Sequence, residues 1–220
     1  MAVFFTAIPT IHAATFSDGE HLSYEVTWPS GLGLGQTSFL ASATTEGWNF
    51  KMSVQASLPI LEIQDEYHAK ATTKLCSTEF SKDTVHGQKK VTERVRFNQR
   101  THKATRKTIT GGESTFSIPP CARDSLTFLY FLREQLATGR IPPPDDIYFG
   151  AQYQIVVTHL ESRYIGIANA RYLTDRILIT IQGPKSEFEF EIFFSKDEAR
   201  TPLLIRIPFE AGTFSLRLMQ

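Results

Sequence analysis

The chain has 220 residues, of which 41% are hydrophobic and 21% are charged, a balance typical of a folded globular protein. Lysine and arginine together number 23, as do aspartate and glutamate, so the chain lacks the positive charge of a dedicated nucleic-acid binder. We therefore expect no nucleic-acid partner. The 17 phenylalanines favour strands and thick apolar walls.

The first residues, MAVFFTAIPTIHAATF, form an apolar run that leads into small alanines and then into polar SDGEH. This pattern predicts that residues 1–14 are the remnant of a secretory signal peptide, incomplete because no Lys or Arg precedes Lys51. A buried N-terminal strand is the alternative. The run is too short to cross a bilayer as a helix, so we expect an exported or periplasmic protein that is not transmembrane.

The next hundred residues are dominated by a period of two. HLSYEVTW (21–28) leads into the turn PSGLGLG and then into QTSFLASAT, which predicts a β-hairpin. GLGLG has no strand-to-helix context, which argues against a dinucleotide-binding loop. Further predicted strands are WNFKMSVQASL, EYHAKATTKL, STEFSKDTVHG, KKVTERVRF, HKATRKTI and ESTFSI.

Residues 82–107 contain nine basic side chains and two acidic ones. In KKVTERVRF the basic residues alternate with apolar ones, so they are expected on an outward face. This face is either a solvated hairpin surface that prevents sheet edges from pairing, or a contact for anionic envelope material such as phospholipid headgroups or acidic glycan. The predicted basic face consists of Lys90, Arg94, Arg96 and Arg106.

Cys76 and Cys121 are the two cysteines of the chain. In an exported protein we expect them to form a disulfide, whereas two buried thiols are the usual arrangement in a cytosolic protein. Two cysteines without nearby histidines make a poor zinc site, and we expect neither a metal nor a cofactor.

The segment CARDSLTFLYFLREQLATGRIPPP interrupts the strands. Helical spacing relates Leu126, Leu129, Tyr130, Arg133 and Leu136. Gly139 followed by three prolines provides a stop. The pattern predicts a helix over about 122–138. Apolar residues off this stripe indicate that the helix is covered on more than one side, so that it plugs or caps the sheet.

After the helix, strand patterns return in DIYFG, YQIVVTHLE, the 163–172 stretch, RILITIQG, SEFEFEIFF, LLIRIPF and TFSLRL. About a dozen strands with one helix predict an all-β fold, a large antiparallel curled sheet or barrel. Closed and open forms are both compatible with the pattern. Because no repeat or linker divides the chain, residues 15–220 are expected to form a single β domain.

SEFEFEIFF (186–194) alternates apolar side chains with Glu187, Glu189 and Glu191. One face of this strand is therefore an apolar wall, and the other is a row of carboxylates typical of a solvated surface. The apolar face either packs against other side chains or lines a ligand cavity. The predicted ligand wall consists of Tyr24, Trp28, Tyr67, Phe188, Phe190, Ile192 and Phe194.

Three segments resemble, in order, the signatures of a bacterial exported family catalogued as domain of unknown function 3108. They are GEHLSYEVTW with GQTSF, then RDSLTFLYFLR, then FFSKDEARTPLLIRIPFEAGTFSLRL, and the resemblance spans about residues 18–220. It implies an envelope or periplasmic protein dominated by antiparallel β-structure, with no established activity. The family commonly has a PAGTF-like turn where this chain reads IGIANARYL, which leaves the register of that hairpin open.

No catalytic residue is assigned, because the six histidines are scattered and no H-E-x-x-H, G-x-S-x-G or P-loop motif occurs. Asp197 and Arg200 are expected to form a local ion pair in a turn.

The leading hypothesis is a non-enzymatic periplasmic binder or carrier of an amphiphile or glycan, with lipid, glycolipid or envelope glycan as the ligand. The alternative is an envelope assembly or structural module that contacts an envelope protein, and a hydrolase with a dispersed site is weaker. A cavity of several hundred cubic ångströms favours the first hypothesis.

Overall fold

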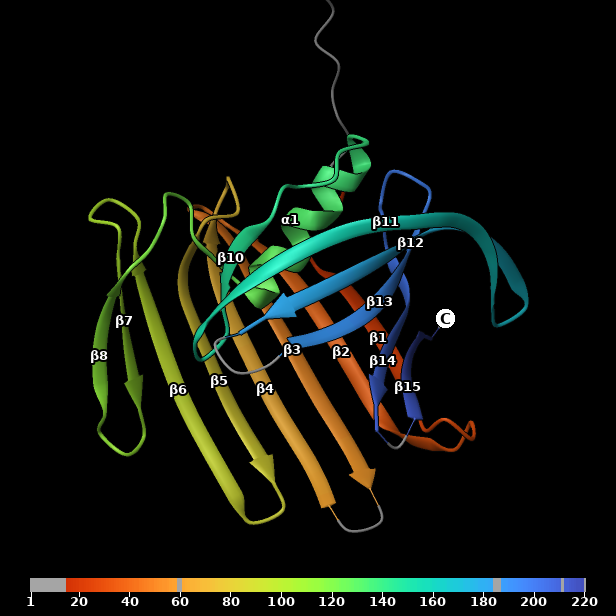
Figure 1. The fold of residues 1–220 in the computed structure, drawn as a ribbon, viewed down its shortest axis with the longest axis horizontal. Helices are drawn as coiled ribbons and strands as arrows, with labels where there is room; N and C mark the ends of the chain where they lie inside the picture. Colours follow the sequence, from red (N-terminus) through yellow and green to blue (C-terminus); the bar gives the residue numbers. More distant parts are fainter. Residues whose placement is uncertain (1–14, 59–60, 184–186, 211, 220) are drawn as a thin grey trace, which may run out of the picture.

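The computed structural model describes residues 15–58, 61–183, 187–210 and 212–219, so the signal-peptide prediction for residues 1–14 lies outside the described part. Its described residues form a fifteen-stranded sheet and one α-helix (Figure 1). The first eight strands are β1 (Glu20–Thr27), β2 (Gly33–Thr44), β3 (Gly47–Leu58), β4 (Leu61–Thr72), β5 (Ser77–His86), β6 (Lys89–Asn98), β7 (Lys103–Thr108) and β8 (Glu113–Ser117). They are followed by β9 (Arg123–Asp124), α1 (Ser125–Ala137), β10 (Asp145–Tyr148), β11 (Gln152–Ile167), β12 (Ala170–Gln182), β13 (Glu187–Ser195), β14 (Pro202–Phe209) and β15 (Gly212–Leu218).

Neighbouring strands of the sheet follow the chain order, with one exception. The spatial order is β8-β7-β6-β5-β4-β3-β2-β1-β15-β14-β13-β12-β11-β10-β9, so the first and last strands lie side by side. Among the strands that the structure describes, only β9 and β10 pair in parallel. The predicted all-β fold with a large antiparallel curled sheet and one helix is confirmed. The 163–172 stretch is not a strand of its own, because it contains the end of β11, a turn and the start of β12.

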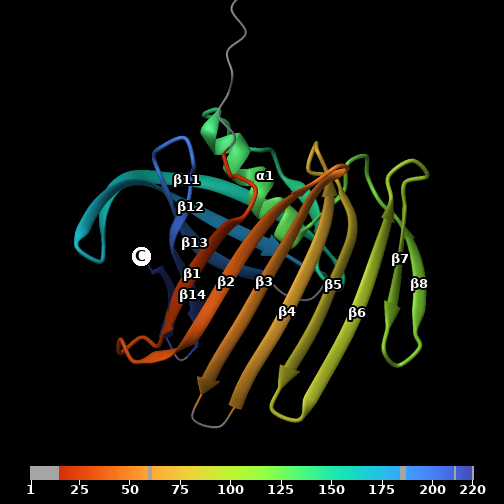
Figure 2. The same ribbon diagram turned by 180° about the vertical axis from the view of Figure 1, so that it is seen from behind.

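The sheet rolls around α1, which lies between the layer of β10–β13 and the layer of β1–β6 (Figures 1 and 2). The helix contacts β3, β4, β9 and β10. It begins at Ser125 because Asp124 is the N-cap, whose carboxylate accepts hydrogen bonds from the backbone N–H groups of Leu126 and Thr127. Its apolar residues are buried on several sides, as expected for a helix that plugs a sheet.

The two edges of the sheet, β8 and β9, do not pair with each other. Instead the residue before β9 meets the start of β5, where the Ser77 N–H donates to the carbonyl of Ala122 at 3.0 Å. The predicted disulfide between Cys76 and Cys121 is confirmed and joins the chain at the same place, with Cα atoms 4.5 Å apart. The sheet is therefore a roll that closes near β5, not a fully paired barrel.

Strands β6, β7 and β8 extend past this closure and overlap β10. Tyr148 of β10 stacks on Phe116 of β8 and meets Phe97 of β6 edge-on, with ring centroids 5.5 and 5.7 Å apart. On the inner face of β5 and β6, the polar ends of Lys82 and Glu93 lie next to Gly150, in the turn before β11.

Candidate functional site

A cavity of about 480 Å³ lies between α1 and the surrounding strands. This volume falls within the range of roughly 300–1,000 Å³ that small-molecule sites occupy. Ser125, Tyr67 and Tyr153 are the polar residues of its lining, and every other lining side chain is aliphatic, aromatic or a methionine. An apolar ligand or the apolar part of an amphiphile suits such a lining, because buried polar groups without partners are costly.

Helical and strand periodicities both place side chains on this cavity. On α1, Leu126, Phe128, Leu129 and Leu132 form one lining stripe. On the opposite side, alternate residues of β12 and β13 pair across the strands, with Ile181 opposite Phe188 and Ile179 opposite Phe190. Ile192 continues the same parity along β13.

The structure places four residues of the predicted ligand wall at the cavity, namely Tyr67, Phe188, Phe190 and Ile192. Their role in binding stays a prediction.

The other three residues of the predicted wall do not line the cavity. Tyr24 is completely buried, and its hydroxyl donates to the carbonyl of Pro202 at 2.7 Å. Phe194 is also completely buried, beside a β-bulge between Phe193 and Phe194 in the pairing with β14. Trp28 packs edge-on against Phe214. These three side chains are core or surface packing residues, which period-two alternation cannot distinguish from cavity residues.

Several cavity residues were missed by the sequence analysis. Alternation in YQIVV and RILITIQG marks the β11 and β12 isoleucines as inward-facing, and the helical stripe marks the leucines of α1. Sequence patterns do not show which inward-facing residues meet each other and which surround an open space, because this depends on how the sheet rolls. Phe39 and Met52 are inward-facing residues that surround the open space of the cavity.

The cavity wall reaches the protein surface at the start of β13. Phe188 lines the cavity and is still 36% exposed. Its ring contacts that of Phe209, which is 55% exposed and meets Phe214, with centroids 6.0 and 5.2 Å apart. This row of aromatic rings continues from the cavity to solvent.

A group of polar side chains borders the cavity at Tyr67 and Phe149. The Tyr67 hydroxyl donates to Asp65 at 3.0 Å, and Asp65 also accepts from His86 at 2.9 Å. Burial raises the pKa of Tyr67, and the charge of Asp65 raises it further, so the phenol is a neutral donor. Lys82 lies directly opposite Tyr67 in the pairing of β4 and β5.

The predicted basic face is only partly formed. Lys90, Arg94 and Arg96 are exposed, and Arg94 and Arg96 alternate with buried residues of β6. Arg94 pairs with Asp83 at 3.2 Å. Including Arg106 in this face was wrong. Arg106 lies opposite Val95 on the inner face and donates to the buried Glu93 at 2.5 Å, because the register of β6 and β7 places it there.

Glu189 and Glu191 of β13 lie on the outer face, along a polar groove of about 490 Å³. Glu191 forms an ion pair with Arg176, and Glu189 accepts a hydrogen bond from Thr180 at 2.9 Å. Both carboxylates are therefore engaged with neighbouring side chains of β12, on the face away from the apolar cavity.

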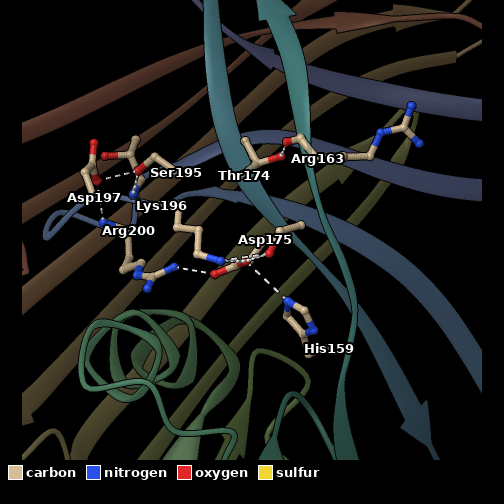
Figure 3. Close-up of polar contacts among 10 residues, drawn as sticks. His159, Arg163, Thr174, Asp175, Ser195, Lys196, Asp197 and Arg200 are labelled. Atoms are coloured by element: carbon tan, nitrogen blue, oxygen red, sulfur yellow. Dashed lines mark hydrogen bonds and ion pairs between the residues drawn. The ribbon is translucent and has the colours of Figure 1, made fainter.

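A cluster around Asp175 of β12 has the residue types of a hydrolase site (Figure 3). Asp175 accepts hydrogen bonds from Ser162 at 2.5 Å, Arg200 at 2.6 Å and His159 at 3.3 Å, and Lys196 lies 3.3 Å away. Burial alone would raise the pKa of Asp175, but these hydrogen bonds outweigh it and hold that pKa well below its usual range.

The geometry of this cluster is that of a structural network. The Ser162 hydroxyl donates a hydrogen bond to the Asp175 carboxylate at 2.5 Å and accepts one from the Lys196 ammonium at 2.9 Å, so both groups around it hold it in place. Neither of the two cavities described above includes these side chains. The expected ion pair of Arg200 with Asp197 is wrong, since the guanidinium binds Asp175 and only the Arg200 backbone N–H donates to Asp197.

Within the described ranges, no three His, Cys, Asp or Glu side chains are grouped as metal ligands. The described residues also contain no helix with the length and apolarity needed to span a bilayer.

Comparison with known proteins places this fold in a family. Residues 23–219 match the family described as protein of unknown function DUF3108. The chain belongs to the DUF3108 family. Among solved structures, this DUF3108 protein is similar to a beta-barrel-like protein of domain of unknown function DUF1849 from Brucella abortus, with a TM-score of 0.63 and 10% sequence identity. The alignment covers 91% of this chain and 95% of that one, which shows a shared fold. No curated protein matches the sequence.

Proposed function

We propose that this protein binds a lipid-like amphiphile in the cavity between α1 and the rolled sheet. The observation that carries the proposal is the 480 Å³ volume with an almost wholly apolar lining. A glycan would leave its hydroxyl groups without partners against such a lining, so an alkyl or acyl chain suits it better. The exposed ring of Phe188 at the cavity wall supports entry from the start of β13.

We infer that the protein works after export, in an oxidising compartment such as the bacterial periplasm. The disulfide between Cys76 and Cys121 supports this location, because such bonds persist outside the reducing cytosol.

The first test is a search for a ligand that copurifies with the protein. The protein is expressed in a bacterium, purified from the periplasm without denaturant, and its organic extract is compared by mass spectrometry with that of a mock purification. We expect a stoichiometric lipid or other amphiphile. A protein that is free of ligand and also fails to bind added palmitate or its methyl ester would contradict the proposal.

The variant Phe190→Glu tests whether the cavity holds this ligand. A carboxylate placed on the apolar lining strongly opposes burial of an alkyl chain, so bound ligand should fall by at least about tenfold. Tyr164→Glu is the matched control, since it also puts a carboxylate in place of an aromatic ring, at a position that is 58% exposed and outside the cavity. Circular dichroism checks that both variants fold. Equal ligand content in the two variants would place binding elsewhere.

A second candidate function is assembly with an envelope protein through a sheet edge. Strand β8 is the edge of the sheet and lies in the part that extends beyond the closure at β5 (Figure 1). Its backbone groups on the open side suit the addition of a strand from a partner. A photoreactive amino acid in place of Thr115 in β8 tests this candidate by crosslinking. The same amino acid in place of Thr105 in β7, which is not the edge strand, is the control.

A further inference from the structure

The ammonium group of Lys82 lies beside the apolar cavity. Lys82 is directly opposite Tyr67, and its Nζ atom is 5.1 Å from the ring centroid of Phe149. Both aromatic residues line the cavity. Lys82 shares the inward parity of β5 with the buried Phe80, so its charge is held on the inner face of the sheet.

Two pairs of charged side chains lie on the same inner face. Arg106 donates to Glu93 at 2.5 Å, and His86 bonds to Asp65 at 2.9 Å. Among the described residues, Lys82 forms no ion pair within 4.0 Å, and its ammonium lies next to Gly150 together with the Glu93 carboxylate that Arg106 binds. Lys82 is therefore a half-buried cation on this face that is available to a ligand.

The surroundings of Lys82 suit a ligand of two parts. Its own position is half-buried, which reduces screening of its charge by water. The Tyr67 hydroxyl and the Asp65 and His86 side chains make the same region polar, whereas the cavity lining beyond Tyr67 and Phe149 is apolar apart from Ser125 and Tyr153. An anionic head next to Lys82 would thus continue into an alkyl chain inside the cavity.

We propose that Lys82 is the anion-binding residue of this site, so that the ligand is a single-chain amphiphile with an anionic head group, such as a long-chain carboxylate or alkyl phosphate. This inference rests on the amphiphile-binding function proposed above. It adds that the head group is anionic and that Lys82 binds it.

The test compares palmitate with methyl palmitate, which has the same chain and no charge, by calorimetry on delipidated protein. Wild-type protein should bind palmitate at least about tenfold more tightly than the ester, because an ionised head group forms a charge-assisted hydrogen bond with Lys82. Hexadecyl phosphate in the same experiment distinguishes a phosphate from a carboxylate as the preferred head. Higher salt should reduce the preference for the anions.

Lys82→Met should abolish the preference for palmitate over its ester while leaving affinity for the ester unchanged. Lys82→Arg should retain the preference, since it keeps the charge. Lys90→Met is the matched control, because it removes the same charge from an exposed position on the neighbouring strand and should behave like wild type.

Two results would overturn the inference. Equal binding of palmitate and its ester by wild-type protein would show that the cavity binds alkyl chains and that Lys82 does not recognise the head group. The amphiphile-binding function would then stand, and this inference would fail. If Lys82→Met lowers stability without changing the preference, Lys82 serves the neighbouring Glu93 and not a ligand. Binding of neither compound by wild-type protein would contradict both proposals.

Discussion

Arg133 of α1 joins three distant segments through one side chain. It is 1% exposed, and its guanidinium donates to both carboxylate oxygens of Glu20 at 2.6 and 2.8 Å. It also donates to the carbonyl groups of Thr15 and Ala199. The planar guanidinium suits this bidentate contact, which a lysine ammonium cannot reproduce. One residue thus holds α1 to β1, to the segment before β1 and to the loop between β13 and β14.

We predict that Arg133→Met lowers the free energy of unfolding by about 3–5 kcal/mol, because it leaves the Glu20 carboxylate with its ion-pair partner removed. Arg133→Lys should recover only part of this loss. Urea denaturation measures the change, with the exposed Arg140→Met as the control that should stay close to wild type. A loss no larger than that of the control would contradict the role assigned to Arg133.

Helical periodicity predicted the position of Arg133 on the helical stripe but did not predict its partners. Glu20 lies 113 residues earlier in the chain, and nothing in the local sequence connects the two. The wrong prediction for Arg106 has the same cause. Its charge suggested that it belongs to the outer basic face, whereas the register of β6 and β7 places it opposite Val95 on the inner face.

Asp175 links elements in a similar way. It lies on β12 and accepts hydrogen bonds from Ser162 of β11 and from Arg200 in the loop between β13 and β14, with His159 and Lys196 nearby. Arg133 binds the same loop through Ala199. The two contacts together fix this loop between the helix and the long β11–β12 hairpin.

The contribution of Asp175 should depend on pH. Because its folded-state pKa is depressed, its contribution to stability is present above the unfolded-state pKa of about 3.9 and is lost as pH falls toward the folded-state value. We predict that Asp175→Asn is less stable than wild type by about 2 kcal/mol at neutral pH, and that this difference shrinks below about pH 4.

Denaturation of both proteins across this pH range measures the prediction. Asp83→Asn is the control, since its ion pair with Arg94 is exposed and contributes little. A difference between Asp175→Asn and wild type that is independent of pH would show that the carboxylate charge is not what stabilises the loop.

Elements themselves were predictable wherever their pattern is local. The helix was expected at about 122–138 and occupies Ser125–Ala137, because helical spacing and a glycine stop are short-range signals. β9 escaped prediction, since a strand of two residues carries no period. Its position next to β10 depends on the path of the chain through the helix between them.

The disulfide between Cys76 and Cys121 holds the rolled sheet closed. Cys76 precedes β5 and Cys121 precedes β9, so the bond joins two points of the sheet that strand pairing does not connect. The chain between them, which includes β5–β8, forms a closed loop of 45 residues in sequence separation.

We predict that replacing both cysteines by alanine lowers the free energy of unfolding by up to about 4 kcal/mol, through the added conformational entropy of the unfolded chain. The urea midpoint of this variant, compared with wild type in oxidising and reducing buffer, measures the effect. Reduced wild type should unfold at nearly the same urea concentration as the variant. If oxidised wild type does so too, the bond contributes nothing to stability.

Local patterns in the sequence were sufficient for the longer strands, the helix and the inward parity of the aromatic residues, because these depend on side-chain periodicity and on neighbouring turn residues. The cysteine pairing followed from the export pattern of the first residues together with the presence of two cysteines. They were not sufficient for the cavity. Phe190 and Phe194 share one strand and one parity, yet Phe190 lines the cavity and Phe194 is packed in the core. Lys82 likewise looked like one more charge of a basic stretch. Which inward side chain meets a neighbour and which meets open space depends on how fifteen strands roll around α1, and that arrangement is set by contacts between residues far apart in the chain.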